Sequence, residues 1–277
     1  NISKFMGIFN GTSNFILSKM THEQTTFKDA LEEAQRLGFA EADPTDDVEG
    51  VDAARKVVIT SYLSFNQVIK LNDVKLVGIS DITLADINAA SALNYKIKLI
   101  GKGTYENGYV NASVEPTLIH KNHQLAAVEN EYNAIYVIGD AVGDTMFYGK
   151  GAGSLATGSA VVSDLLNVAL FFESNLHTLP PHFELKTEET KEMMDGAEPV
   201  VIQEKSNYYI VISNNNKSLE KVEYDIKKKL PFHKSLQLVE RDQDTYAIIV
   251  TGIETSPEKV LNQSGFNVKK VYPVEGV

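Results

Sequence analysis

The first 65 residues follow a helical pattern of hydrophobic and polar positions, interrupted by one loop. Between residues 27 and 37, apolar side chains recur every three or four positions, at Phe27, Leu31, Ala34 and Leu37. This spacing predicts an amphipathic helix, and Gly38 predicts its end. An acidic loop at 41–49 then leads to a second predicted helix, from about residue 50 to residue 65.

Residues 74–173 alternate between strand and helix patterns. The predicted elements are a helix at 82–94, strands at 95–104, 109–116, 134–139 and 145–148, and a long helix at about 154–174. The turn Glu106-Asn107-Gly108 is typical of a hairpin between the first two strands. A glycine-rich turn at 149–153 precedes the long helix.

The last hundred residues divide into a connecting segment and a small domain. Residues 176–206 contain Pro180, Pro181 and Pro199 and many charges, which predicts a linker. Residues 207–277 have the order β-α-β-β-α-β, the ferredoxin-like pattern. The fold class is therefore α/β (α+β): a domain at 1–175 with helices packed on a mixed sheet, then a ferredoxin-like domain at 207–277.

Composition narrows the classes of function. The 277 residues carry a net charge of −11, which argues against a nucleic-acid partner. The chain has no cysteine, which excludes disulfides and thiolate metal sites and fits a reducing, cytoplasmic compartment. There is no basic amphipathic stretch, the apolar runs fall short of a membrane span, and no signal peptide is visible; we therefore expect no membrane partner.

The most informative segment is the acidic loop and the helix behind it. Six carboxylates fall within residues 41–52, and Asp52 and Lys56 share one helix face. That face continues through Ile59 and Leu63, so we expect it to point inward and to bury the ammonium group of Lys56. An i,i+4 ion pair is too weak to justify such burial. A lysine that donates a proton, or stabilises negative charge on a substrate, is the better interpretation.

Three other interpretations of these groups stay open. The acidic stretch can be a solvated loop in which Asp46 or Asp47 caps the next helix. Its carboxylates can hold a metal, although their spacing is not that of a calcium loop; we expect no metal. The turns at 149–153 and 10–14 can face an anion or ligand, or serve only as tight packing and as a helix cap. Neither a zinc site nor a serine nucleophile has support.

Three motifs together resemble homoserine dehydrogenase. They are Gly7-Ile-Phe-Asn10-Gly-Thr12-Ser-Asn14, the long stretch from Gly38-Phe-Ala-Glu41 to Asp52-Ala-Ala-Arg55-Lys56, and the later segment Gly151-Ala-Gly153-Ser. They occur in the family's order and cover about residues 1–175. Residues 207–277 resemble an ACT domain, a small regulatory module found in many bacterial members.

The resemblance implies an enzyme that interconverts L-aspartate 4-semialdehyde and L-homoserine with NAD(P). Lys56 matches the proton donor or acceptor at the substrate oxygen, and Asp52 stands beside it in the catalytic set. The substrate-binding residues implied are Glu41, Asp47, Asp52 and Thr12. The residues implied to approach the cofactor are Gly38, Gly153 and Asn10. The family also implies a homodimer and the threonine, methionine and isoleucine pathways.

This chain departs from the family pattern in two important places. The family's N-terminal dinucleotide-binding domain is missing, together with a second lysine and a possible monovalent-cation site. We therefore expect this chain alone to be inactive. The ACT turn is replaced by Ser213-Asn-Asn-Asn-Lys-Ser218, which puts an amino-acid effector there in doubt. A non-catalytic amino-acid sensor is the alternative function, and the intact Glu41, Asp52 and Lys56 argue against it.

Overall fold

The computed structural model describes residues 1–173, 206–213, 217–230, 233–253 and 257–276. The predicted linker at 176–206 lies outside these ranges except for Ser206, as does most of the turn after the first strand of the C-terminal domain. All statements below concern the described residues.

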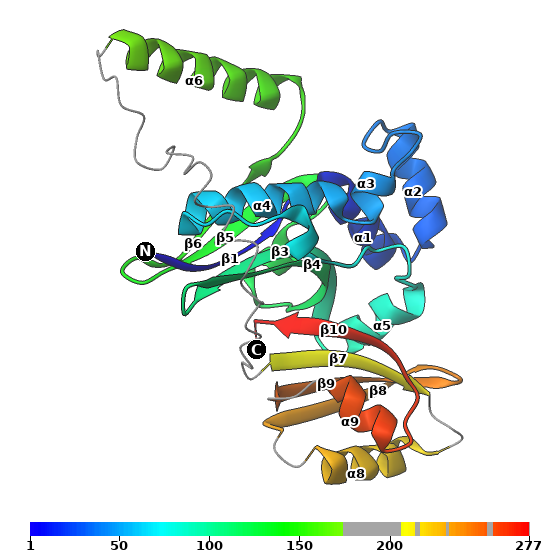
Figure 1. The fold of residues 1–277 in the computed structure, drawn as a ribbon. Coiled ribbons are helices and arrows are strands. Elements are labelled where there is room, and N and C mark those ends of the chain that lie inside the picture. Colours follow the sequence, from blue (N-terminus) through cyan, green and yellow to red (C-terminus); the bar gives the residue numbers. More distant parts are fainter. Residues whose placement is uncertain (174–205, 214–216, 231–232, 254–256, 277) are drawn as a thin grey trace.

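One ten-stranded sheet runs through the described part of the chain, in the order β6-β5-β1-β3-β4-β10-β7-β9-β8, with the short β2 beside β4 (Figure 1). The strands are β1 (Ile2–Ile8), β2 (Lys75–Leu76), β3 (Tyr95–Glu106), β4 (Tyr109–His120), β5 (Tyr132–Gly139), β6 (Gly143–Lys150), β7 (Ser206–Ser213), β8 (Ser235–Asp242), β9 (Thr245–Ile253) and β10 (Val268–Glu275). Two pairs of neighbouring strands are parallel, β10 with β4 and β2 with β4. The other neighbouring strands, including β10 and β7, are antiparallel. The sheet is therefore mixed, as the sequence predicts.

The helices divide between the two halves of the sheet. Their bounds are α1 (Gly11–Glu23), α2 (Phe27–Arg36), α3 (Thr45–Val48), α4 (Val51–Phe65), α5 (Leu84–Ala92), α6 (Ser154–Glu173), α8 (Leu219–Lys229) and α9 (Pro257–Gln263), with 3-10 turns at Leu71–Asp73 and Gln124–Ala127. In Figure 1, α1 and α4 cover the N-terminal half, while α8 and α9 cover the far face of the C-terminal half. The helices predicted at 50–65 and 154–174 are thereby confirmed.

The strand β1 is a correction to the sequence analysis, which describes residues 1–65 as helical with a loop. β1 lies in the middle of the sheet, between β5 and β3. Its last four residues, from Phe5 to Ile8, are all buried. A central strand covered on both faces loses the polar-apolar alternation by which strands are recognised, and this explains the omission.

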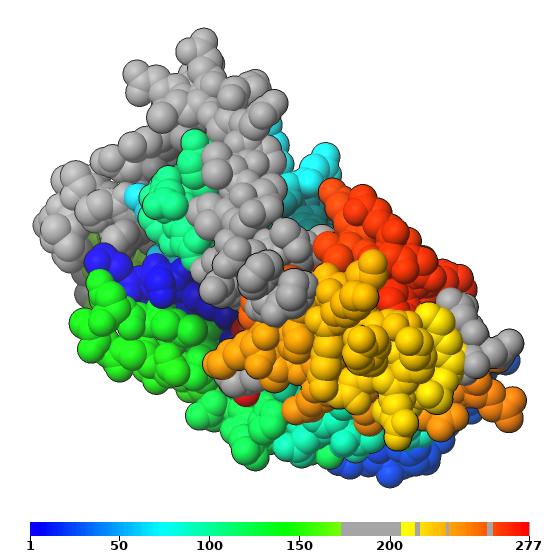
Figure 2. Space-filling view, turned by 90° about the horizontal axis from the view of Figure 1, so that it is seen from below, coloured from blue at the N-terminus to red at the C-terminus, as the bar shows by residue number. Residues whose placement is uncertain are grey.

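The C-terminal domain has the predicted β-α-β-β-α-β order and is joined to the first domain through its last strand. Its strand order β10-β7-β9-β8 is that of a ferredoxin-like sheet. Val274 and Glu275 of β10 pair with Leu118 and Ile119 of β4, which makes the two sheets continuous. Figure 2 shows the yellow-to-red residues of this domain seated beside the blue and green residues of the first.

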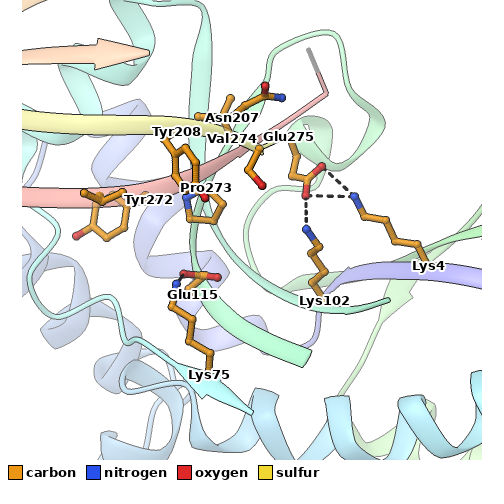
Figure 3. A pocket seen from close by; sticks show the side chains of 12 residues that line it. Lys4, Lys75, Lys102, Glu115, Asn207, Tyr208, Tyr272, Pro273, Val274 and Glu275 are labelled. Atoms are coloured by element: carbon orange, nitrogen blue, oxygen red, sulfur yellow. Dashed lines mark hydrogen bonds and ion pairs between the residues drawn. The ribbon is translucent and has the colours of Figure 1, made fainter. Parts of the chain in front are cut away.

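Two ionic groups cross the junction between these domains, one around the buried Asp86 and one around the partly buried Glu275. The carboxylate of Asp86, at the start of α5, accepts hydrogen bonds from Arg241 Nε of β8 at 2.8 Å and Lys270 Nζ of β10 at 2.7 Å. The carboxylate of Glu275 lies between Lys4 and Lys102 at 3.0 and 2.9 Å (Figure 3). Each carboxylate thus meets two cations from the opposite domain, which ties the domains together.

The helix α6 stands apart from the body of the molecule in Figure 1, and nearly all of its described residues are exposed. Eight of its large apolar side chains are exposed: Leu155, Val161, Val162, Leu165, Leu166, Val168, Leu170 and Phe172. By length and composition alone, Ser154–Phe172 is a candidate membrane span. The prediction that all apolar runs fall short of a span is therefore wrong for this helix. The same composition is typical of a helix that packs into a larger core.

Candidate functional site

The site is built around the first turn of α1, where Asn10 is the N-cap. Its side-chain oxygen accepts a hydrogen bond from the backbone N–H of Ser13 at 2.8 Å, so the predicted helix cap is confirmed. Its amide nitrogen donates to Asp47 Oδ1 at 2.6 Å and to Asp52 Oδ2 at 2.9 Å. One side chain therefore both starts the helix and holds two carboxylates together.

Lys56 lies one turn after Asp52 on α4, and its ammonium group completes the cluster. Nζ donates to Asp52 Oδ2 at 2.7 Å and to the backbone carbonyl of Phe9 at 3.0 Å. Asp52 Oδ2 therefore accepts from Lys56 and from Asn10 at once. An ammonium group, two carboxylates and an amide, from two segments far apart in the sequence, are therefore linked by hydrogen bonds in the structure.

The expected burial of Lys56 is wrong for this structure. The Lys56 side chain is 46% exposed, and Ile59 and Leu63 on the same face are 59% and 67% exposed. The helix turns its opposite face to the sheet instead: its buried residues are Ala53, Ala54, Val57, Ser61 and Phe65. Small and apolar residues occur all round this helix, so the sequence does not show which of its faces packs against the sheet.

The acidic loop also differs from its predicted form. Residues Thr45–Val48 form the short helix α3, and neither Asp46 nor Asp47 caps α4. Gly50 takes that position with φ +80, and a Cβ there would meet side chains of Leu76 and Val114 at 3.1 Å. Glycine thus allows both the left-handed turn and the close approach that bring Asp52 beside Asn10.

Thr12 connects this cluster to the turn that ends α2. Its hydroxyl donates to the backbone carbonyl of Phe39 at 2.6 Å. Gly38, the residue before Phe39, is exposed and has φ +79. A Cβ built on Gly38 would meet no atom within 4 Å. The predicted helix end at Gly38 is confirmed, and the backbone there is open to a bound group.

Two predicted site residues are not held in the cluster. Glu41 is exposed on the loop after α2, and its carboxylate has no ion pair or hydrogen bond with the described residues. Gly153, φ +116, lies in the turn before α6, and a Cβ there would meet no atom within 4 Å. The structure therefore brings Asn10, Asp47, Asp52 and Lys56 together and leaves these two apart.

Sequence analysis missed a second charged cluster, on β3 behind α1. The ammonium of Lys98 is buried and donates to Asn14 Oδ1 at 3.0 Å and to the carbonyl of Val128 at 2.6 Å. Glu129 lies 3.4 Å from it and also pairs with Lys96. Burial lowers the pKa of Lys98 to about 8, against the attraction of Glu129. The sequence signal for it is slight: two lysines, Lys96 and Lys98, stand two positions apart in a predicted strand.

Glu129 gives this cluster a predictable response to acid. Burial raises its pKa, but Lys98 and Lys96 outweigh that effect and bring the pKa down to about 2. The ionised carboxylate is therefore favoured by folding above its ordinary pKa of 4.5, and its contribution is lost as the pH falls toward 2.

We expect Glu129→Gln to lower the urea midpoint of this chain at pH 6 and to lower it less at pH 3, where part of the contribution of the carboxylate is already lost. Urea unfolding followed by circular dichroism at both values measures this. Glu23→Gln, at an exposed i,i+4 pair on α1, is the matched control and should have little effect at either pH. An equal loss at pH 6 and pH 3 for Glu129→Gln would contradict the assignment.

A cavity of about 360 Å³ lies elsewhere, at the domain junction shown in Figure 3. Glu275 and its lysines line one part of it, and the ion pair between Lys75 and Glu115 lines another. It shares no residue with the cluster around Asn10. The chemistry suggested by the sequence motifs therefore does not lie in this cavity.

Comparison with known proteins defines the class of this chain. A homoserine dehydrogenase family model matches residues 1–166, and a model of the homoserine dehydrogenase C-terminal domain matches 205–277. Homoserine dehydrogenase of Bacillus subtilis (strain 168) is 55% identical over 167 residues, which are 60% of this chain and 39% of that protein.

Solved structures agree with this result, one over the whole chain and another over about three fifths of it. Homoserine dehydrogenase of S. aureus at pH 6.0 is 71% identical with a TM-score of 0.87, covering 100% of this chain and 66% of that one. A hyperthermophilic archaeal homoserine dehydrogenase mutant in complex with NADPH is 29% identical with a TM-score of 0.52, covering 61% of this chain and 48% of that one.

The fold is an α/β domain with helices packed on a mixed sheet, and a ferredoxin-like domain follows it. The chain belongs to the homoserine dehydrogenase family, and it spans between two fifths and two thirds of the length of the relatives described above.

Proposed function

We propose that this chain is the substrate-binding and catalytic part of a homoserine dehydrogenase, which interconverts L-homoserine and L-aspartate 4-semialdehyde. The observation that carries the proposal is the position of the Lys56 ammonium on Asp52 and the Phe9 carbonyl. An ammonium group has three N–H donors, and these two contacts occupy two of them. The third is available for an oxygen atom of a substrate.

That third donor suits the chemistry of an aldehyde. Reduction of the aldehyde builds negative charge on its oxygen, and a nearby ammonium stabilises that charge and supplies the proton. In the reverse direction, Lys56 accepts the proton of the hydroxyl group. Asp52 holds the ammonium in place, which is why we assign both residues to catalysis.

The carboxylates around Lys56 can bind the positively charged amino group of the substrate. Asp47 and Asp52 each accept one hydrogen bond from Asn10, and a carboxylate has further acceptor positions. The carboxylate of Glu41, on the adjoining loop, has no hydrogen-bond or ion-pair partner among the described residues. We propose that Glu41, Asp47 and Asp52 bind the substrate ammonium group, with Thr12 holding the turn at Gly38.

The cofactor assigned to this activity is NAD(P), which exchanges a hydride with the substrate when bound. The open backbone at Gly38 fits the edge of such a site, and Asn10 and Gly153 are the other candidates. Because the chain spans only part of its relatives' length, we assign the main nucleotide-binding domain, and a monovalent-cation site, to the part that it does not cover.

We extend the proposal to the organisation of the protein. Residues 1–175 form the catalytic and dimerisation domain of a homodimer, 176–206 a linker, and 207–277 an ACT-like regulatory domain with an amino-acid effector. The enzyme serves threonine, methionine and isoleucine biosynthesis in the cytoplasm. The ferredoxin-like strand order supports the assignment of the C-terminal domain.

Glu41 offers a test of substrate binding. The test uses the completed protein, meaning this chain joined to the part of the S. aureus relative that it does not cover. Loss of a charged hydrogen bond is worth about 1.5–3 kcal/mol, so Glu41→Ala should raise KM for homoserine roughly tenfold or more. Steady-state kinetics measure the change. Asp43→Ala, on the same exposed loop, is the control; a KM unchanged by Glu41→Ala would remove Glu41 from the site.

A ligand screen separates the proposed enzyme from an amino-acid sensor. We expect the melting temperature of the completed protein to rise with homoserine in the presence of NADP, and this rise to disappear in Lys56→Ala/Glu41→Ala. Threonine and methionine serve as comparison ligands. Stabilisation by threonine or methionine but not by homoserine would favour the sensor.

A further inference from the structure

Lys98 is a buried charge that the proposed reaction does not use. Its side chain is 2% exposed, and removing an ammonium from water is expensive unless it is well bonded. Two of its contacts are neutral oxygens, Asn14 Oδ1 and the Val128 carbonyl, and the distance to the Glu129 carboxylate is longer, 3.4 Å. An apolar side chain would fill this position at a lower desolvation cost. Packing alone therefore does not explain why a lysine is present.

The side chain that Lys98 holds, Asn14, docks α1 on one segment of the chain. The Asn14 amide nitrogen donates to the carbonyls of Val128, Asn130 and Tyr132 at 3.2, 2.9 and 3.2 Å. Ser18, one turn later, accepts a hydrogen bond from the backbone N–H of Asn130 at 3.1 Å. Its oxygen accepts from Lys98, and its two N–H donors are shared among the three carbonyls, so the Asn14 side chain has a fixed orientation.

Asn14 is one helical turn from Asn10. Its backbone N–H donates to the carbonyl of Asn10 at 3.3 Å, closing the first turn of α1. Asn10 in turn holds Asp52, and Asp52 holds Lys56. A shift in the docking of α1 would therefore move the Asn10 amide away from Asp52, and the ammonium of Lys56 would lose its position.

We propose that Lys98 is a positioning residue, which acts through Asn14 and the first turn of α1 to hold Lys56 in its reactive place. This inference rests on the proposed dehydrogenase function. Lys98 does not touch the substrate in this scheme, and its effect passes through Lys56. A misplacement of about 1 Å can cost a hundredfold in rate, so we expect about a tenfold to hundredfold fall in kcat when the contact is lost.

The test compares Lys98→Met and Lys96→Met in the completed protein. Lys96 lies on the same strand and pairs with the same carboxylate, Glu129, but has no bond to Asn14. We expect Lys98→Met to lower kcat about tenfold or more at a temperature where the variant is fully folded. Lys96→Met should keep kcat within about twofold of the parent.

A second comparison separates positioning from a general structural defect. In a Lys56→Ala background, Lys98→Met should cause no further fall in the residual rate, because both changes remove the same function. Asn14→Ala replaces Lys98→Met if the latter does not fold, and the same results are expected of it.

Three outcomes are distinguishable. A parent protein without homoserine-dependent activity overturns the proposed function itself. An active parent with an unaffected Lys98→Met or Asn14→Ala variant overturns the positioning role alone. A further loss of the same factor in the Lys56→Ala background also overturns it, because Lys98 would then act independently of Lys56.

Discussion

Lys56→Ala in the completed protein should lower kcat by about 10²–10⁴, the range for a general acid or base. The ammonium of Lys56 donates to Asp52 and Phe9 and has one donor to spare, and alanine leaves no group that can supply a proton there. KM for homoserine should change much less, because the proposed binding carboxylates remain. Steady-state kinetics with homoserine and NADP measure both constants.

Arg55→Ala is the matched control for this prediction. Arg55 precedes Lys56 on α4 and forms its ion pair with Asp46 rather than with Asp52. Its removal alters the charge of the helix to the same extent and should leave kcat close to that of the parent. Near-parental turnover by Lys56→Ala would remove this lysine from the chemistry.

The largest expected effect on stability comes from Asp86. Its carboxylate is fully buried between Arg241 and Lys270 at the domain junction. Burial alone would raise its pKa, but Arg241 and Lys270 outweigh this and lower the pKa of Asp86. Removing one partner of a buried ionic group leaves uncompensated charge and costs about 3–5 kcal/mol. We expect Asp86→Ala to lower the free energy of unfolding of this chain by about that amount.

Urea unfolding followed by circular dichroism measures this loss. Asp225→Ala is the control, because Asp225 also lies between two lysines, Lys217 and Lys221, but at the surface of α8, where its side chain is 22% exposed and the lysines are 43% and 58% exposed. Exposed pairs contribute little, so its midpoint should stay close to the parental one. If the two substitutions have equal effects, the buried group at the junction does not hold the domains together.

The elements with a clear period were predictable from sequence, and those defined by long-range packing were not. The helices α4 and α6 and the β-α-β-β-α-β order of the C-terminal domain follow from local spacing and turn residues. The central strand β1 has no alternation because both its faces are covered. Nothing local indicates that β10 pairs with β4 and makes one sheet of two domains.

Some features of the site were also predictable from local sequence, and others were not. Asp52 and Lys56 are four residues apart on a helix, so their contact follows from the sequence, and Asn10 is a recognisable cap. The exposure of Lys56 was mispredicted, because a helix with small and apolar residues all round does not reveal which face meets the sheet. The bond between Lys98 and Asn14 joins residues 84 positions apart, which no local pattern predicts.

Homoserine-dependent reduction of NAD or NADP by the completed protein tests the central claim most directly, with this chain alone assayed beside it. We expect activity in the completed protein, its near-complete loss in Lys56→Ala, and little or no activity in this chain alone. If the completed protein is folded and yet reduces neither cofactor with homoserine, the claim that residues 1–175 carry homoserine dehydrogenase chemistry is contradicted.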